Sequence, residues 1–391
     1  MKFEWTKKKL SDIADFNPRE TIKKGAIAKK IPMDVLRPFY RDIPYYVEEC
    51  FSGGTKFRNG DTIMARITPC LENGKTAQVS ILNNGEVGFG STEYIVFRAK
   101  EGIADKDYLY YLVCSPKVRE PAIKSMVGSS GRQRVQTDVV KNLEIDVPPL
   151  VEQEKIGSFL KALDNKIALN DRINKNLERQ AQAVYNKMFS EVNSEPVELS
   201  SIIDVRDGTH DSPKVQTTGY YLITSKHLLS FGVDKASANH ISKADFDKIN
   251  ERSLVETKDI LMSMIGTIGL ISYIPYEVID FAIKNVALFK TSHTPELAYY
   301  FLCYLKSERT LQHIEKCLAG STQKYISLGE LRKMPIYSPT TNEIREFNCL
   351  VKPMFEEIVS RTYENTLLAE MRDTLLPKLM SGEFDASDIE L

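Results

Sequence analysis

The sequence has no long hydrophobic run. Its most apolar stretch, residues 260–274, is only 15 residues long, contains Ser, Thr and Gly, and ends at Pro275. Because a helix needs roughly 20 apolar residues to cross a bilayer, this stretch predicts one or two buried strands and no membrane association. The basic N-terminal residues are followed by no apolar segment, so we expect no secretory signal.

Paired cysteines are also missing. The six Cys are scattered, without a Cys-x-x-Cys pair, and the five His do not cluster. This pattern predicts reduced thiols in a cytoplasmic protein and no zinc site.

The sequence offers no catalytic or cofactor motif. Gly74-Lys75-Thr76 looks like the end of a phosphate loop, but Pro69 stands where the first Gly is needed. Residues 88–93 lack the third Gly of a dinucleotide-binding turn, and no Asn/Asp-Pro-Pro-aromatic, HExxH or GxSxG motif occurs. We therefore expect a protein that is not an enzyme and that has no catalytic residues, metal or cofactor.

There is little net charge, because 52 Lys and Arg face 53 Asp and Glu. The balance differs along the chain: residues 1–147 carry a net +5, 148–190 +2, 191–338 −2 and 339–391 −6. The basic first half permits nucleic-acid binding without demanding it. The composition, with 42% hydrophobic residues, is that of a globular protein, and 391 residues suggest two or three domains.

What the sequence does contain is a duplication. Residues 148–190 match 339–381 at a constant offset of 191, and the stretches before them both run from Gly-Ser through Gln, Lys or Arg to Pro. Further upstream, GDTIMARI matches KDILMSMI at an offset of 198, and EYIVFR matches NVALFK at 192. A period this long indicates a duplicated globular unit, each copy followed by a helix.

Both helical segments carry a coiled-coil seam in which apolar residues alternate at spacings of four and three. The first seam is Ile156, Leu160, Leu163, Ile167, Asn170, Asn174, Leu177, Ala181, Val184 and Met188; the second is Phe347, Val351, Met354, Ile358, Arg361, Asn365, Leu368, Arg372, Leu375 and Leu379. Polar residues interrupt each seam near its middle, where buried Asn commonly fixes register and partner. The equal lengths favour an antiparallel pair within the chain; the alternative is two helices that each pack on their own globular domain.

The fold class that follows is α+β. Short β-branched runs such as 77–82 alternate with turn signals, and aromatic-rich stretches such as 107–114 and 296–305 suit buried helices. We predict two mixed α/β domains from an internal duplication, joined by two long antiparallel coiled-coil helices. The expected boundaries are 1–147, 148–190, 191–338 and 339–391.

Several segments resemble one known family. The stretch from Val147 to Phe189, VPPLVEQEKIGSF…YNKMF, is similar to the central helical region of type I restriction-modification specificity subunits. MRDTLLPKLMSGEF at 371–384 resembles their distal helical region, and DGTHDSP at 207–213 and the two Gly-Ser…Gln stretches resemble their target recognition domains. The resemblance covers essentially the whole chain, including the duplication.

This resemblance implies a subunit in which each target recognition domain reads one half of a bipartite site in double-stranded DNA. The helices would set the distance between the halves and dock two methyltransferase subunits, and restriction subunits would join them. Exposed side chains such as Glu178, Arg179 and Lys187 could form the docking face, or could be only a solvated surface. The specificity subunit itself would perform no chemistry.

The expected DNA contacts are chosen by residue type and position. Arg and Lys read guanine, Asn and Gln read adenine, and Ser and Thr read either base, while Gly128 and Gly320 would let backbone amides approach a phosphate. Asp207, by contrast, is expected to cap a turn. The candidate DNA-binding residues are Arg66, Lys75, Ser129, Ser130, Arg132, Gln133, Arg134 and Gln136 in the first domain, and Thr209, His210, Lys214, Ser225, Lys226, Ser321, Thr322, Gln323, Lys324 and Tyr325 in the second.

Two other functions remain open from the sequence. The chain could be a stand-alone two-domain DNA-binding regulator, or a coiled-coil scaffold that binds no nucleic acid. The candidate contacts of the two domains differ at almost every position, which predicts an asymmetric recognition sequence in place of a palindrome.

Overall fold

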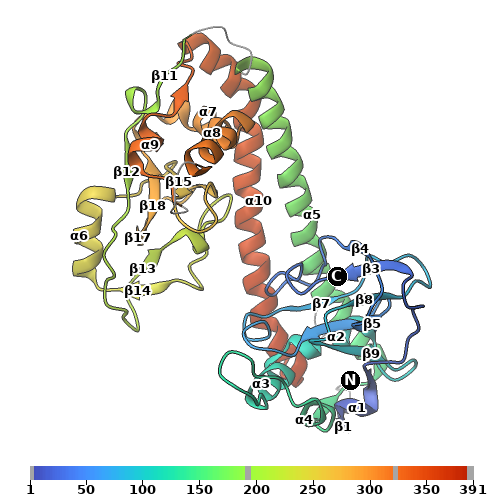
Figure 1. Ribbon diagram of the computed structural model, residues 1–391. Coiled ribbons are helices and arrows are strands. Elements are labelled where there is room, and N and C mark those ends of the chain that lie inside the picture. The colour runs from blue at the N-terminus through green and yellow to red at the C-terminus, as the bar shows by residue number, and fades with distance from the viewer. Residues whose placement is uncertain (1–3, 190–194, 320–324, 385–391) are drawn as a thin grey trace. The chain divides into compact units, whose positions relative to one another are not determined.

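The computed structural model describes residues 4–189, 195–319 and 325–384, and the chain divides into two compact units (Figure 1). Unit 1 consists of Met1–Asn170 together with Glu364–Leu391, and unit 2 of Asp171–Tyr363. The division falls inside both long helices, so each unit contains one globular part and one half of each helix.

The described elements of unit 1 are β1 (Thr6–Lys9), α1 (Leu10–Ile13), β2 (Ala14–Phe16), β3 (Ile27–Ile31), β4 (Val47–Cys50), β5 (Thr55–Phe57), β6 (Thr62–Ala65), β7 (Thr76–Gln78), β8 (Gly88–Gly90), β9 (Tyr94–Ala99), α2 (Lys106–Cys114), α3 (Pro116–Lys124), α4 (Thr137–Lys141), β10 (Glu144–Val147), the first half of α5 (Leu150–Phe189) and the second half of α10 (Thr341–Ser381). One antiparallel sheet has the order β2-β9-β6-β7, and a second has the order β4-β3-β8-β5, in which β3 and β8 are parallel. β1 pairs with β10 and so ties the start of the chain to the strand that precedes α5.

The described elements of unit 2 are the second half of α5, β11 (Val197–Glu198), η1 (Leu199–Ser201), β12 (Val205–Asp207), β13 (Tyr220–Ile223), η2 (Ser225–His227), β14 (Asn239–Ile241), α6 (Lys243–Ser253), β15 (Ile260–Ser263), β16 (Ile271–Tyr273), β17 (Phe281–Ile283), β18 (Val286–Phe289), η3 (Thr291–His293), η4 (Pro295–Leu297), α7 (Ala298–Leu305), α8 (Glu308–Ala319), α9 (Leu328–Arg332), β19 (Pro335–Ile336) and the first half of α10 (Thr341–Ser381). Its sheets have the orders β12-β18-β15-β16 and β14-β13-β17, and β11 pairs with β19. The apolar stretch 260–274 forms β15 and β16, so the prediction of buried strands is confirmed. Among the described residues, no helix combines the length and the apolar character that a bilayer span requires.

The duplication predicted from the sequence is present in the fold. In each unit the first sheet has the same strand order, and Thr62 pairs with Phe97 as Ile260 pairs with Phe289. The second sheet of each unit contains one parallel pair, β3 with β8 or β13 with β17. The two mixed α/β domains of the expected fold class are thus confirmed.

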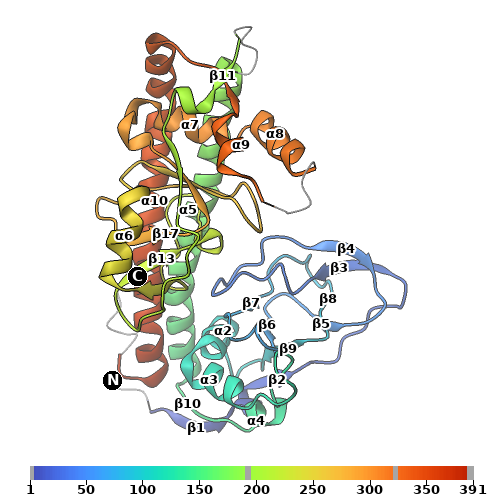
Figure 2. The ribbon, with the colours of Figure 1, turned by 60° about the vertical axis from the view of Figure 1, so that its left-hand side comes forward.

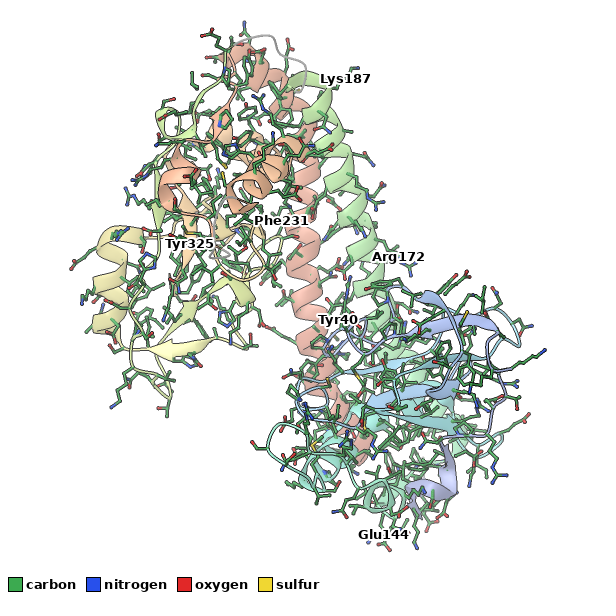
Figure 3. All side chains as sticks on the ribbon, viewed as in Figure 1. Tyr40, Glu144, Arg172, Lys187, Phe231 and Tyr325 are labelled. Atoms are coloured by element: carbon green, nitrogen blue, oxygen red, sulfur yellow. The ribbon has the colours of Figure 1, made fainter. Side chains whose placement is uncertain are left out.

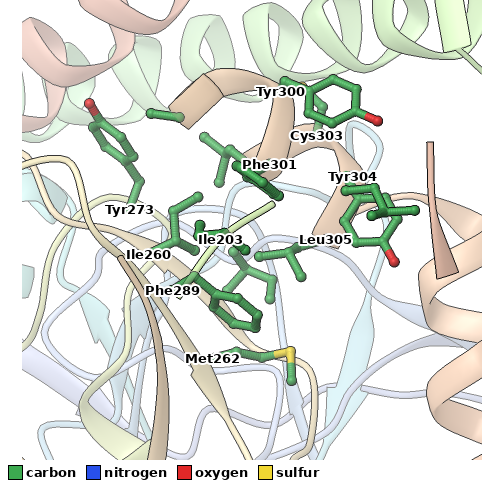
Figure 4. Packing of buried hydrophobic residues seen from close by; sticks show 14 of the residues in the cluster. Ile203, Ile260, Met262, Tyr273, Phe289, Tyr300, Phe301, Cys303, Tyr304 and Leu305 are labelled. Carbon is green, nitrogen blue, oxygen red and sulfur yellow. The ribbon is translucent and has the colours of Figure 1, made fainter. Parts of the chain in front are cut away.

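The core of unit 2 lies between its first sheet and α7 (Figure 4). Residues from β15 and β18, such as Ile260 and Phe289, pack with the buried α7 residues Phe301 and Leu305. The same cluster extends to the long helices, where Tyr185 of α5 and Phe347 of α10 place their ring centroids 6.2 Å apart. The helices therefore belong to the core of the unit and are not separate from it.

The long helices are antiparallel, as Figures 1 and 2 show. In unit 1, Nδ2 of Asn170 lies 2.9 Å from Oδ1 of Asn365, and in unit 2, Nδ2 of Asn174 lies 3.4 Å from Oγ1 of Thr362. As the residue number rises along α5, that of its partner falls along α10. The helices Leu150–Phe189 and Thr341–Ser381 lie within the matching segments 148–190 and 339–381 of the sequence.

The first seam is mostly buried, whereas Met354, Leu368 and Leu375 of the second are only partly buried and Leu376 and Met380 beside it are buried. Ile156, Leu160, Ile358 and Leu379 are almost fully buried, whereas Val184 and Met188 are only partly buried. Beyond the predicted seam, Tyr185 and Phe189 are buried instead, because this end of α5 packs against α7 as well as α10. The alternative of helices that pack on their own domains also holds in part, since both modes of packing occur together.

Candidate nucleic-acid interface

In unit 1 the candidate residues gather at one edge of the first sheet. β6 ends at Ala65, which is paired with Tyr94 at the start of β9. The backbone N of Arg66 donates to the carbonyl of Glu93 at 2.9 Å, and the N of Ala65 donates to the carbonyl of Lys75 at 3.0 Å. The loop between β6 and β7 therefore begins and ends at this edge.

A turn from α3 to α4 lies against the same loop. Val127 and Arg134 exchange backbone hydrogen bonds of 3.0 and 2.9 Å, and Ile67 forms a β-bridge with Arg134. Within the turn, Gly128 has a φ of 136°, and a Cβ there would lie 3.0 Å from the Arg132 carbonyl oxygen. A glycine is thus required by the turn itself, whether or not its amide also meets a phosphate.

Two of the candidate arginines share one carboxylate. The Glu93 carboxylate accepts from Nε and Nη2 of Arg134 at 3.0 and 2.7 Å, and Nε of Arg66 lies 3.7 Å away. Hydrogen bonding from Arg134, helped by the positive charge of Arg66, lowers the pKa of Glu93 below its ordinary value despite partial burial. The net charge of this triad is +1, and the bidentate hydrogen bonds orient the Arg134 guanidinium, whereas Arg66 makes an ion pair without a hydrogen bond from Nε.

The other candidates of unit 1 differ in their exposure and in the contacts that they already make. Ser129, Ser130, Arg132 and Gln136 are exposed on the turn, and within the described residues the Arg132 side chain makes no hydrogen bond or ion pair. Gln133 is half-buried, with its backbone bonded in both directions to Thr68. The Nζ of Lys75 donates to the carbonyl of Met33 at 2.9 Å, so this side chain is already engaged.

In unit 2 the equivalent edge carries the loop after β12. Thr209 forms a parallel bridge with Lys284, and its backbone N donates to the carbonyl of Ile283 at 3.0 Å. The ring of His210 is held at both nitrogens, with Nδ1 2.8 Å from Oδ1 of Asn285 and Nε2 3.0 Å from Oδ2 of Asp207. The His210 side chain nevertheless remains 64% exposed.

The Asp207 carboxylate has a partner outside its own turn. Its carboxylate is buried at the end of β12 and pairs with Arg252 of α6 as well as with His210. The carboxylate thus closes its own turn through His210 and also binds a distant guanidinium, which the sequence did not predict. Three residues that the sequence did not single out, Lys284, Asn285 and Arg252, complete this surface.

The remaining candidates of unit 2 fall in two places. Ser225 begins η2 just after β13, whose last residue Ile223 pairs with Ile283, so Ser225 and the exposed Lys226 follow a strand that ends near Thr209. Lys214 is exposed farther along the loop. Tyr325 is 43% exposed and forms a β-bridge with Ile265, while Ser321, Thr322, Gln323 and Lys324 lie outside the described residues.

The bridge between Ile265 and Tyr325 repeats the one between Ile67 and Arg134. Ile265 follows Ile67 by 198 residues, and Tyr325 follows Arg134 by 191 residues. Both offsets also relate matching segments of the two repeats in the sequence. Each unit therefore places the same two loops together at the same edge of its first sheet. Figure 3 shows Tyr325 beside the first sheet of unit 2. In the described residues, no group of three or more His, Cys, Asp or Glu has a geometry suited to a metal ion.

Comparison with known proteins assigns the chain to a family. The model described as the type I restriction modification DNA specificity domain matches residues 2–179 and again 191–347. The chain therefore belongs to the type I restriction-modification DNA specificity family. Its two matches correspond to the two copies of the duplication.

Individual relatives agree with this. The MjaIX specificity subunit of Methanocaldococcus jannaschii is 24% identical over 318 residues, which cover 74% of this chain and 71% of that protein. The HindI specificity subunit of Haemophilus influenzae is 22% identical over 402 residues, covering 83% and 87%. The EcoAI specificity subunit of Escherichia coli is 35% identical, but over only 39% of this chain and 26% of its own length.

Among solved structures, the S subunit of a type I restriction-modification system from M. genitalium matches with a TM-score of 0.54. The match covers 96% of both chains at 16% identity, and so it supports the fold. The family does not favour the alternative of a stand-alone DNA-binding regulator.

Proposed function

We propose that each target recognition domain of this specificity subunit reads one half of an asymmetric bipartite site in double-stranded DNA. The observation that carries the proposal is the pair of equivalent sheet edges, built alike but lined by different side chains. Unit 1 presents Arg66, Arg134 and the exposed Arg132, whereas unit 2 presents His210 and Lys284. Different donors and acceptors on equivalent sheet edges select different bases.

The division of roles within unit 1 follows from the contacts. Arg134 is hydrogen-bonded to Glu93 and so is preorganised for one orientation, Arg66 is paired with the same carboxylate at 3.7 Å, and Arg132 is free to reach a phosphate or a base edge. Ser129, Ser130, Gln133 and Gln136 supply the uncharged donors and acceptors, and Lys75 contributes through its charge. In unit 2 the corresponding set is Thr209, His210, Lys214, Ser225, Lys226, Ser321, Thr322, Gln323, Lys324 and Tyr325.

The long helices act as a spacer and as a docking platform for two methyltransferase subunits, and restriction subunits complete the assembly. The docking face includes Arg179 and Lys187, which are exposed, and Glu178, which also binds Lys306 at 3.1 Å. Recognition domains at 1–147 and 191–338 with helical regions at 148–190 and 339–391 fit this division of labour. The subunit selects the sequence, and its partners supply the chemistry.

The experiment is a salt titration of DNA binding by the complex that contains this subunit. Arg132→Ala with Arg134→Ala should weaken binding and reduce the slope of log affinity against log salt by about 0.9 for each phosphate that is no longer neutralised. The control is Lys23→Ala with Lys24→Ala, which removes an equal charge from two exposed lysines before β3. Equal slopes for the two double variants would contradict the proposed interface.

A further inference from the structure

A polar cluster joins the long helices inside unit 1. The Tyr111 hydroxyl donates to Oδ2 of Asp164 at 2.6 Å, and Nη1 of Arg372 lies 2.7 Å from Oδ1 of the same carboxylate. Tyr111 is 2% exposed and Asp164 7%, and the Arg372 side chain is 12% exposed. This cluster thus connects α2, α5 and α10 by buried hydrogen bonds.

Other charged groups lie beside the cluster, but they have partners of their own. Arg41 is buried beside it and binds Oδ1 of Asn165 at 2.6 Å and the carboxylate of Asp42 at 2.9 Å. Arg372 also binds the exposed Asp373 at 2.8 Å. Asp164 itself is buried on α5 and is bonded to α10 through Arg372.

The duplication shows what stands at the same positions in unit 2. At the helical offset of 191, Asp164 corresponds to Phe355 and Arg372 to Ala181. At the offset of 192 that relates β9 to β18, Tyr111 corresponds to Cys303; this offset also aligns Ser115 with Ser307, which directly precede α3 and α8.

The three replacements are all apolar and all buried. Phe355 is 2% exposed, Ala181 0% and Cys303 2%, and they belong to one hydrophobic cluster. A hydrogen-bonded triad of Tyr, Asp and Arg in one unit is therefore an apolar triad of Cys, Phe and Ala in the other. Because all three residues differ together, neither site contains a buried charge that lacks its partner.

We propose that this difference makes each long helix select the other as its partner and reject a second copy of itself. The two halves of the chain, residues 1–189 and 195–391, descend from one repeat, so each has a helix that could pair with its own kind. The polar triad at one end and the apolar triad at the other render the two like-with-like pairings unfavourable.

Consider two copies of α5 in the same antiparallel register. Ala181 occupies in α5 the place that Arg372 occupies in α10, so each Asp164 would face Ala181 and lose its guanidinium. In two copies of α10, each Arg372 would face Phe355 and lose the carboxylate of Asp164. A buried charge without its partner is strongly destabilising, whereas the mixed pair satisfies every group.

The consequence rests on the proposed function. One chain can close its own helix pair only if the helices pair heterotypically, because homotypic pairing requires the helix of a second chain. A pair of identical halves would carry two copies of one domain and would read a symmetric site. The triad thus protects the asymmetry of recognition.

The test uses the full chain with a protease site inserted within residues 190–194 and cut after folding. The cut protein is unfolded in urea and refolded, so that each half can choose its partner, and native mass spectrometry identifies the pairs. For the wild type we expect first-half with second-half pairs to exceed either homotypic pair by at least tenfold. A statistical mixture in the wild type would overturn the proposal, whatever the result of the DNA-binding experiments.

Two single variants give opposite expectations. Arg372→Ala should release homodimers of the second half only, because an alanine then faces Phe355, while Asp164 still opposes pairing of two first halves. Asp164→Phe should release homodimers of the first half only, because a phenylalanine then faces Ala181. If both variants keep exclusive heterotypic pairing, or release the same homodimer, the selectivity lies elsewhere and the proposal fails.

A matched control and a second measurement guard against variants that do not refold. Asp373→Asn removes the other, exposed partner of Arg372 and should leave the pairing unchanged. In the uncut chain, a double-mutant cycle between Asp164→Ala and Arg372→Ala reports their coupling directly. A coupling indistinguishable from zero would overturn the proposal even if no refolded halves were obtained.

Discussion

Nζ of Lys290 lies 2.6 Å from the carboxylate of Asp259, and both side chains are almost completely buried. The equivalent pair in unit 1 is Arg98 with Asp61, joined by two hydrogen bonds of 2.7 Å. In both units the aspartate also accepts a 2.8 Å bond from a backbone N three residues earlier. A buried carboxylate between a turn and a strand is therefore a shared structural element of the two repeats.

Replacement of Asp259 by Ala should destabilise unit 2 by about 3–5 kcal/mol, because Lys290 would keep its charge with only the half-exposed Glu256 as an acidic partner. Asp61→Ala should destabilise unit 1 by a smaller amount, since the Arg98 side chain is 29% exposed and retains Glu20 at 2.7 Å. Chemical denaturation followed by a probe in each unit measures both losses. Equal losses in the two units would show that burial of the cation does not decide the effect.

Replacement of Lys258 by glycine should stabilise unit 2. It has a φ of 73° and stands where unit 1 has Gly60, with a φ of 91°; each donates its backbone N across to the next strand, at 2.7 and 2.8 Å. A left-handed conformation costs a side-chain-bearing residue roughly 1 kcal/mol. Lys258→Gly should therefore raise the stability of unit 2 by about that amount, and Gly60→Lys should lower that of unit 1 in thermal melts. A stability loss for Lys258→Gly would mean that its exposed side chain contributes more than the strain removes.

The Glu93 triad predicts a pH-dependent contribution to stability. The folded pKa of Glu93 is lowered mainly by its hydrogen bonds from Arg134, so its contribution is complete above the unfolded pKa and is lost as the pH falls through the folded value. We expect wild type to exceed Glu93→Gln by up to about 1 kcal/mol at neutral pH, and the difference to vanish in acid. Urea titrations between pH 7 and pH 3 measure it. The control Glu120→Gln, whose partner Lys124 is also exposed, should show a smaller difference; a Glu93 difference that grows in acid would refute the argument.

The loop after β12 predicts a defect confined to one half-site. Thr209→Ala with His210→Ala should weaken protection of the second half-site in footprints of the complex and leave the first half-site protected, because the two loops belong to different units. A discriminating pair of this kind contributes about 1–3 kcal/mol for each base that it reads. Val215→Ala, on the same loop and 58% exposed, is the control. Full protection of both half-sites in the double variant would remove this loop from the interface.

The helical pair predicts a change of spacer length. Deletion of residues 167–173 and 362–368 removes facing heptads, since Asn170 contacts Asn365 within them. Each helix shortens by about 10 Å, which corresponds to about three base pairs at 3.4 Å each. Selection of bound sequences from a random-spacer library should therefore yield a shorter preferred gap. Deletion of 167–173 alone should instead destabilise the pair, and an unchanged gap in the double deletion would exclude a ruler role.

The sequence alone determined the duplication, the two long helices and the fold class, and it favoured antiparallel pairing of the helices. These follow from local periodicity: the spacing of Ile156, Leu160 and Leu163, and the offset that carries them onto Phe347, Val351 and Met354, require no knowledge of distant contacts. The surface loops were found in the same way, because turn residues and polar clusters are local signals.

Only the tertiary structure decided which candidates meet and which are already occupied. Glu93 binds Arg134 and pairs with Arg66, Asp207 pairs with Arg252 from 45 residues away, and Thr209 forms a β-bridge with Lys284. The structure also made Asp164 and Arg372 partners across 208 residues. Such contacts depend on how strands and helices pack over long sequence separations, and local periodicity does not encode which charges that packing brings together.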